Sequence, residues 1–166
     1  MATKAVLSEE EFLRLSFPDV EPEYRDGEVL GRSMPNNAHS KAQARFVAFF
    51  VNREKSHGGF TRPELRLCLR AGRYVTADNC VFWPEEPRMS VPEIPPLIVI
   101  EILSPDDRLS EVRDKLQEYR DWGVAHVWLA DPERRIFYVY DHGLLEVPSY
   151  QVPELNLEIK PEDIFD

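Results

Sequence analysis

The apolar residues of this chain recur in patterns that predict a sheet with helices packed on it. The most apolar run, residues 95–100, ends at Glu101 and predicts a strand covered on both faces. A helical pattern over residues 108–122 ends at Gly123, and a second apolar strand is expected at residues 125–130. A strand, a helix and another apolar strand in this order predict a parallel crossover.

The N-terminal part of the chain predicts a short helix, a hairpin and a long helix. The capping-box pattern of Ser8 and Glu11 predicts a helix that runs from there to about residue 16. An Asp-Gly turn within residues 24–30 is typical of a hairpin. Residues 36–55 have an apolar face at helical spacing and predict a long amphipathic helix.

Two further strands are expected in the middle of the chain. Residues 61–70 alternate between apolar and polar side chains, which is typical of a strand with one buried face. Residues 73–83 form a second strand-like segment, and the proline-rich residues 84–96 predict a surface loop. Residues 1–166 together are predicted to form a single α/β domain, with a mixed central β-sheet flanked by helices.

Composition and charge narrow the range of functions. The net charge of −10 argues against strong non-specific nucleic-acid binding, because phosphate neutralisation supplies most of that affinity. Cys68 and Cys80 lack metal-type spacing and are expected to be reduced, buried thiols of a cytoplasmic protein. The N-terminus has no apolar segment typical of a secretion signal, and no apolar run approaches the roughly 20 residues of a membrane helix, so no membrane partner is expected.

Two carboxylates carry the candidate chemistry. Glu101 ends the most apolar strand, where an unpartnered carboxylate would cost several kcal/mol or take up a proton. Asp78 is expected at the end of the strand before it, so the two side chains converge on one ion if these strands are neighbours in the sheet. The carbonyl of Ile102 would lie beside them as a third oxygen. Such ligands suit Mg²⁺, which lowers the pKa of a bound water and stabilises charge on a phosphoryl group.

Lys115 is the candidate for a fixed cation beside that ion. It falls on the margin of the apolar arc that runs from Leu109 to Tyr119, and a long side chain can reach a pocket from such a position. The alternative is a surface ion pair with Glu111, which lies four residues earlier in the favourable orientation. Spacing alone leaves both interpretations open.

Glu23 and His39 are further candidates. Glu23 precedes the predicted hairpin, where a surface acid is the ordinary alternative. His39 lies in the first turn of the long helix, on the same face as Ala42 and Phe46, so its alternative is a hydrogen-bonded histidine at the edge of the core. Because a helix N-terminus disfavours imidazolium, His39 is expected to be neutral and to orient a water or a carboxylate.

These candidate residues belong to a longer series of segments along the chain that together match one protein family. The segments are Glu23-Tyr24-Arg25-Asp26-Gly27-Glu28, His39, Asp78, Glu101-Ile102-Leu103-Ser104-Pro105, Lys115-Leu116-Gln117-Glu118-Tyr119, Gly123-Val124, Val127-Trp128 and Asp131-Pro132. In them the chain resembles the Uma-two family of proposed endonucleases, which is part of the PD-(D/E)XK restriction-endonuclease-like superfamily. The similarity extends from about residue 8 to 165.

The resemblance implies a restriction-endonuclease-like fold with an N-terminal helix and hairpin, and it implies a homodimer. It also implies that Asp78 and Glu101 are metal ligands and that Lys115 stands in for the lysine that the superfamily carries on a strand. Glu23 and His39 match the glutamate and the histidine of the family, and catalytic roles are expected for them.

The chain departs from the superfamily motif at two positions. Ala77 stands where the motif has a proline before the acid, and Leu103 stands where the motif has its strand lysine. Activity would therefore depend on Lys115 reaching the site from its helix.

Two functions follow from these expectations. The first is an endonuclease that uses Mg²⁺, or Mn²⁺ in its place, to hydrolyse phosphodiester bonds of nucleic acid, with DNA as the expected partner. The alternative is a non-catalytic homodimeric binding module that retains the nuclease fold. The net charge and the two departures from the motif favour this alternative.

Overall fold

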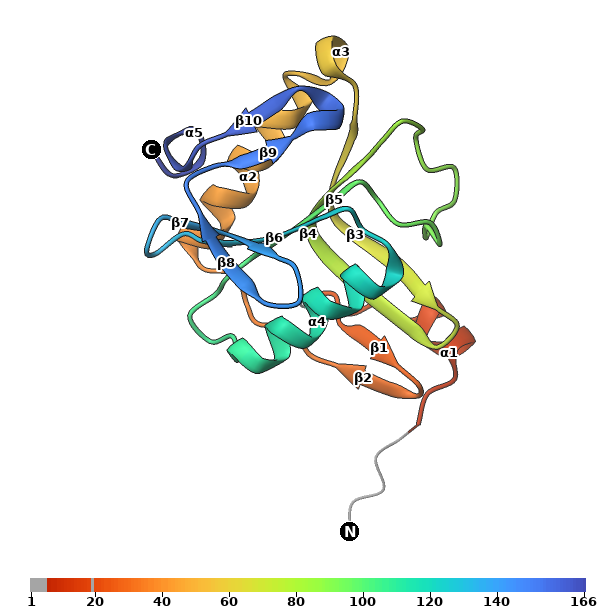
Figure 1. Cartoon of the computed structure of the whole chain (residues 1–166). Helices are drawn as coiled ribbons and strands as arrows, with labels where there is room; N and C mark the ends of the chain where they lie inside the picture. The colour runs from red at the N-terminus through yellow and green to blue at the C-terminus, as the bar shows by residue number, and fades with distance from the viewer. Residues whose placement is uncertain (1–5, 19) are drawn as a thin grey trace.

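The computed structural model describes residues 6–18 and 20–166, where helices cover both faces of a mixed sheet (Figure 1). The elements follow in chain order: α1 (Glu9–Arg14), β1 (Glu23–Arg25), β2 (Glu28–Leu30), α2 (Asn37–Val51), α3 (Glu54–His57), β3 (Phe60–Arg70), β4 (Arg73–Phe82), β5 (Ile98–Ile102), α4 (Leu109–Trp122), β6 (His126–Asp131), β7 (Ile136–Tyr140), β8 (Leu144–Val147), β9 (Tyr150–Val152), a 3₁₀ turn (Pro153–Leu155), β10 (Leu157–Ile159) and α5 (Pro161–Phe165).

The main sheet has the strand order β2-β1-β4-β5-β6-β7-β8, and β3 pairs with β4 outside this path. Strands β4 and β5 are antiparallel, whereas β5 and β6 are parallel and are connected through α4. Strands β9 and β10 pair with each other in a separate small sheet. The predicted α/β fold with a mixed central sheet and the predicted parallel crossover are therefore confirmed.

Apolar side chains cover both faces of the main sheet. On one face, Leu116 and Tyr119 of α4 join residues of β4, β5 and β6 in a buried cluster. On the other face, α2 packs with the C-terminal elements around Trp128, Phe137 and Tyr150, whose rings lie close together. Figure 1 shows α4 crossing the front of the sheet and the blue C-terminal elements gathered near α2.

The register of β4 against β5 determines where the two candidate carboxylates lie. Pairing runs from Val81 opposite Ile98 to Asn79 opposite Ile100. Continued by one residue, this register places Asp78 opposite Glu101. Opposite residues of an antiparallel pair lie close together. The strands of the two acids are neighbours, which is the condition on which their convergence was predicted.

The predicted N-terminal elements are confirmed, with one difference in length. Ser8 caps α1 in a capping box with Glu11, and β1 and β2 form the predicted hairpin. The helix predicted over residues 36–55 is shorter: α2 ends at Val51, and the short helix α3 follows it. Asn36 caps α2 by accepting a hydrogen bond from the His39 amide.

Two details of the sequence interpretation are corrected by the structure. Asp78 lies inside β4 rather than at a strand end, because pairing with β3 continues on both sides of it. Leu109 is exposed rather than part of the apolar face of its helix, because it lies at the first residue of α4, beyond the sheet. Cys68 and Cys80 are free and buried, as predicted.

Other predictions concern the chain as a whole. The assignment of residues 1–166 to a single domain stays a prediction, and residues 1–5 and 19 lie outside the described part. Among the residues that the structure does describe, no helix combines the length and the apolar character needed to cross a membrane. The elements after residue 143 follow no pattern that the sequence interpretation used, and α5 packs against α2.

Candidate active site

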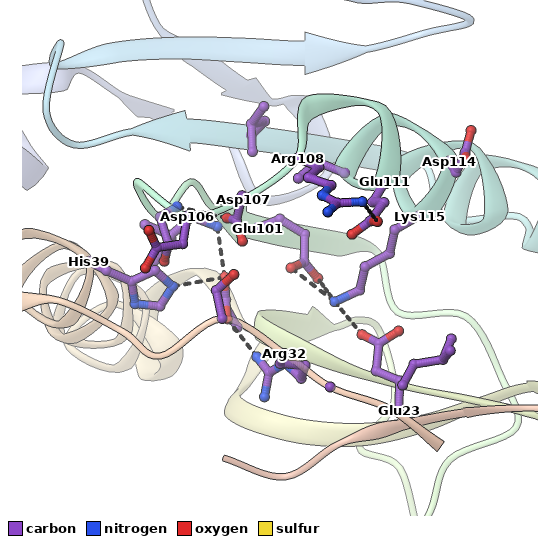
Figure 2. Close-up of a pocket in the computed structure, with 18 of the residues that line it drawn as sticks. Glu23, Arg32, His39, Glu101, Asp106, Asp107, Arg108, Glu111, Asp114 and Lys115 are labelled. Atoms are coloured by element: carbon purple, nitrogen blue, oxygen red, sulfur yellow. Dashed lines mark hydrogen bonds and ion pairs between the residues drawn. The ribbon is translucent and has the colours of Figure 1, made fainter. Parts of the chain in front are cut away.

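A cavity of about 610 Å³ brings together the residues to which the sequence assigns catalytic or metal-binding roles. It lies between the β1–β2 hairpin, the loop that leads to α2, strands β4 and β5, and the first half of α4. Figure 2 shows the side chains of Glu23, Glu101 and Lys115 directed toward one another within it. The predicted residues that line it are Glu23, His39, Asp78, Glu101, Ile102 and Lys115.

The Asp78 carboxylate is buried and held by three donors. Its Oδ2 accepts a hydrogen bond from the Ile102 amide at 2.8 Å and lies 3.2 Å from His39 Nε2, while its Oδ1 accepts one from Arg32 at 2.9 Å. Burial raises the pKa of Asp78. The hydrogen bond and charge of His39 and the charges of Lys115 and Arg32 outweigh burial, so the pKa lies below its ordinary value. Asp78 therefore remains ionised and fixed in position.

Glu101 is also buried, with a different balance of charges. The Tyr119 hydroxyl donates to its Oε1 at 2.8 Å, and Lys115 Nζ lies 3.1 Å from each of its carboxylate oxygens. Burial raises the pKa of Glu101 to about 7, since the attraction of Lys115 does not offset burial together with repulsion from Asp78. Burial is the largest cause of this rise, and the like charge of Asp78 adds to it.

Lys115 reaches the site from α4, as predicted. Its ammonium donates to the Thr76 carbonyl at 2.9 Å and contacts Glu101 at 3.1 Å and Glu23 at 2.7 Å. Three acceptors match the three N–H groups of an ammonium. Burial lowers the pKa of Lys115, but the charges of Glu101 and Glu23 raise it overall, so the side chain stays charged. The alternative of a pair with Glu111 is wrong for this structure.

Glu23 is buried rather than a surface acid. Its Oε1 contacts Lys115, and its Oε2 lies 3.1 Å from Arg73, which also binds Glu118 on α4. Burial raises the pKa of Glu23, but the charges of Lys115 and Arg73 outweigh burial. The pKa therefore lies below its ordinary value, and the carboxylate is ionised. Glu23 therefore holds Lys115 in position from the side opposite Glu101.

His39 lies on the buried face of α2 with Ala42 and Phe46, as predicted. Its Nε2 contacts Asp78, while its Nδ1 is buried and has no hydrogen-bond partner among the described residues. The prediction that the helix N-terminus keeps it neutral is not supported. Burial lowers the pKa of His39, but the hydrogen bond and charge of Asp78 raise it above its ordinary value. The nearby carboxylate outweighs the helix terminus.

Comparison with known proteins identifies the family of the chain and a similar structure. A model of the Uma2 family, described as "Putative restriction endonuclease", matches residues 9–165. The chain belongs to the Uma2 family. Among solved structures, a protein from Anabaena variabilis ATCC 29413 described as a "putative nuclease belonging to DUF820" is 28% identical, over 96% of this chain and 97% of its own, with a TM-score of 0.77. No curated protein is significantly similar to the chain.

Membership of the Uma2 family confirms the family resemblance and the restriction-endonuclease-like fold that the sequence predicts. The fold and the family are nuclease-like. The two departures from the superfamily motif, Ala77 and Leu103, both affect the surroundings of the site.

Leu103 and Ala77 both belong to the apolar core of the α4 face. Leu103 packs partly buried in this core, and its apolar side chain supplies no charge to the site. The cation beside Glu101 comes from Lys115 instead. Ala77 is fully buried in the same cluster as Cys80, three residues later, so the two-residue alternation of β4 is interrupted beside Asp78. Glu64, opposite Asp78 in the register of β3, has a φ of 47°, which is uncommon for a residue other than glycine.

Some residues of this Uma2-family site were not identified as functional from the sequence. Tyr119 fits the helical apolar arc, and that pattern does not show that its hydroxyl binds Glu101. Gln43 donates to the Asp78 carbonyl at 2.9 Å and to Glu64 at 2.7 Å. Arg32 follows the hairpin in a segment without regular pattern, and it contacts both Asp78 and Glu64 at 2.9 Å. No sequence signal distinguished Arg32 from a surface arginine.

The donor set fits Mg²⁺ better than a softer metal. The described residues contain no group of three His, Cys, Asp or Glu side chains arranged to hold an ion. Mg²⁺ needs only one or two carboxylates, and it completes its coordination with water and substrate phosphate. Asp78 and Glu101 supply the carboxylates, and the Ile102 peptide lies against Asp78.

Proposed function

We propose that this protein is a nuclease that hydrolyses phosphodiester bonds of DNA, with Mg²⁺ as its cofactor and Mn²⁺ as a substitute. The observation that carries the proposal is that Asp78 and Glu101, next to the last paired residues of β4 and β5, line one cavity, with the Lys115 ammonium 3.1 Å from Glu101. A family described as "Putative restriction endonuclease" and a similar structure described as "a putative nuclease" support the same class of reaction.

Each residue has a role that follows from its contacts. Asp78 and Glu101, with the carbonyl of Ile102, would hold the cation, which when bound lowers the pKa of a water and stabilises negative charge on a phosphoryl group. Lys115 supplies a fixed positive charge where negative charge develops. The remaining residues keep these groups in place: Glu23 positions Lys115, and His39 positions Asp78.

The proposal is tested by comparing variants in a cleavage assay. Wild-type protein is incubated with plasmid, linear duplex, single-stranded DNA and RNA, with Mg²⁺, with Mn²⁺ and with a chelator. We expect cleavage of DNA that requires a metal and that falls about 100-fold or more in Asp78→Ala and in Lys115→Ala. The control is Asp131→Ala, because Asp131 is another buried strand carboxylate that does not line the cavity and accepts a hydrogen bond from the Arg134 amide. It should cleave like the wild type.

Two results would contradict the proposal: full activity in both site variants, or no cleavage by the wild type on any of the four nucleic acids. The second result would favour the non-catalytic homodimeric module. The acids Asp106, Asp107, Glu111 and Asp114 line the cavity and, with a net charge of −10, specifically favour that alternative, since they oppose the approach of phosphate. The homodimer is part of both functions, and sedimentation analysis measures it.

A further inference from the structure

Arg32 places a positive charge on the carboxylate to which the proposed function assigns a metal. It lies in the segment between β2 and α2, and its side chain is only 13% exposed. Its two terminal nitrogens each lie 2.9 Å from a carboxylate oxygen, one of Asp78 on β4 and one of Glu64 on β3. Figure 2 shows the guanidinium directed into the cavity that Glu101 and Lys115 also enter.

This cation and a metal would compete for the same oxygen. Asp78 Oδ2 is held by the Ile102 amide and His39, whereas Arg32 is the one hydrogen-bond partner of Oδ1 among the described residues. Oδ1 is therefore the oxygen that becomes available to a metal when Arg32 leaves. A divalent cation next to a guanidinium at a buried carboxylate is strongly repelled, because charges interact strongly where water is excluded. Arg32 must therefore withdraw from Asp78 when a metal binds there.

The contacts around Arg32 allow that withdrawal. Asp78 keeps its bonds to Ile102 and His39, so its carboxylate stays in place without Arg32. Glu64 keeps its bond to Arg32 and is itself held by Gln43 Nε2 at 2.7 Å, so the guanidinium remains tethered at the edge of the cavity. An arginine side chain presents N–H groups in a planar fork that matches two phosphate oxygens.

We propose that Arg32 is a phosphate-binding residue that neutralises Asp78 in the metal-free protein and transfers to a substrate phosphate once a metal displaces it. This inference rests on the proposed function, since it takes Asp78 as a metal ligand. It assigns Arg32 two measurable effects of opposite sign. Arg32 weakens the binding of metal alone, and it strengthens the binding of nucleic acid in the presence of metal.

The test measures the affinity of Mn²⁺ for the wild type, Arg32→Gln and Arg32→Lys by titration calorimetry, without nucleic acid. Arg32→Gln should bind Mn²⁺ roughly tenfold more tightly than the wild type, and Arg32→Lys should lie between them, since lysine keeps the charge but lacks the fork. The matched control is Arg25→Gln, because Arg25 lines the same cavity but pairs with Glu118. It should change the affinity by less than about threefold.

A second measurement tests the phosphate contact. Binding of a short DNA duplex with non-hydrolysable phosphorothioate linkages is measured in saturating Mn²⁺ by fluorescence anisotropy. Arg32→Gln should bind it roughly tenfold more weakly than Arg25→Gln does. Equal loss in the two variants would overturn the phosphate role of Arg32.

The outcomes separate this inference from the proposed function. If the wild type binds Mn²⁺ through Asp78, shown by loss of binding in Asp78→Asn, and Arg32→Gln does not bind more tightly, then the inference fails and the metal site stands. If only Arg32→Gln binds Mn²⁺, the inference is supported and the wild-type metal site fails. If neither binds, both fail. Should Arg32→Gln not fold, as judged by circular dichroism, an unchanged Mn²⁺ affinity in Arg32→Lys would overturn the inference.

Discussion

The two ends of the β4–β5 pair differ sharply although they belong to the same two strands. At one end, Val81 lies opposite Ile98, and both side chains are completely buried among apolar neighbours. At the other end, the register continues past Asn79 and Ile100 to Asp78 and Glu101, and Glu101 is only 9% exposed. The difference is therefore in the partners rather than in the degree of burial.

The comparison shows how one strand pair can serve both the core and a site. At the apolar end, contacts are non-directional, and burial itself is favourable. At the charged end, burial is unfavourable unless each charge has a partner, and Lys115, Arg32 and His39 provide those partners. The same backbone ladder therefore supports stability at one end and places reactive groups at the other.

The largest effect is expected from placing a charge at the apolar end. Val81→Asp buries a carboxylate without any of the partners that Asp78 has, so the free energy of unfolding should fall by about 4 kcal/mol or more. Urea denaturation followed by circular dichroism measures it. The control Val81→Ala removes apolar contacts without adding a charge and should lose less. If Val81→Asp were as stable as Val81→Ala, the contrast between the two ends would be wrong.

A smaller effect is expected from removing the central cation at the charged end. Lys115→Met leaves Glu101 and Glu23 without their shared partner and should lower the free energy of unfolding by about 3 kcal/mol. The double variant Lys115→Met with Glu101→Gln should lose less than the sum of the single losses, because the two residues interact. Lys41→Met is the control, since Lys41 is an exposed lysine on α2. Additive losses in the double variant would contradict the pairing.

The third effect is a dependence of stability on pH in the absence of metal, and it is spread over several pH units. The folded-state pKa of Glu101 is raised from an ordinary value of 4.5 to about 7, so between these values the folded chain binds more protons than the unfolded chain. The stability that Glu101 contributes is therefore present at low pH and is lost as the pH rises through this window. Because one pKa unit corresponds to about 1.4 kcal/mol, the full shift corresponds to at most about 3.5 kcal/mol, reached only when the pH has risen through the whole window.

Glu101→Gln removes this titration and serves as the reference. The difference in unfolding free energy between the wild type and Glu101→Gln should change across the window and should be constant above it. Denaturation in the presence of a chelator, at a series of pH values, measures the difference. A difference that is constant at all pH values would show that Glu101 titrates normally and that the repulsion from Asp78 is small.

Local patterns in the sequence predicted much of this fold. Ser8 and Glu11 are close in sequence, and their capping box depends only on each other, so the start of α1 could be predicted. The apolar run before Glu101 and the helix after it specified the β5–α4–β6 crossover, because period and order determine that unit. The boundary of α2 was less accurate, since helix ends depend on weak local preferences.

The site was predictable only in part, for a physical reason. Asp78 and Glu101 come close together because β4 and β5 are neighbouring strands. The sequence does not show which strands are neighbours, so their convergence could be predicted only on that condition. Glu23 and His39 were proposed through a family resemblance, and their burial could not be calculated from spacing. Arg32 was missed because its contacts join three segments distant in sequence, and no periodic pattern records such contacts.

Because Asp78 and Glu101 lie on neighbouring strands, the proposed cation binding would be a property of the folded chain alone. In an unfolded chain, 22 intervening residues separate the two acids, so no site exists there. A ligand that binds only the folded form shifts the folding equilibrium by mass action, by about 2.7 kcal/mol at a concentration 100 times its dissociation constant. The melting temperature in rising Mn²⁺ therefore reports on this site without any substrate. Cations can therefore be screened against the proposed site before any nucleic acid is chosen.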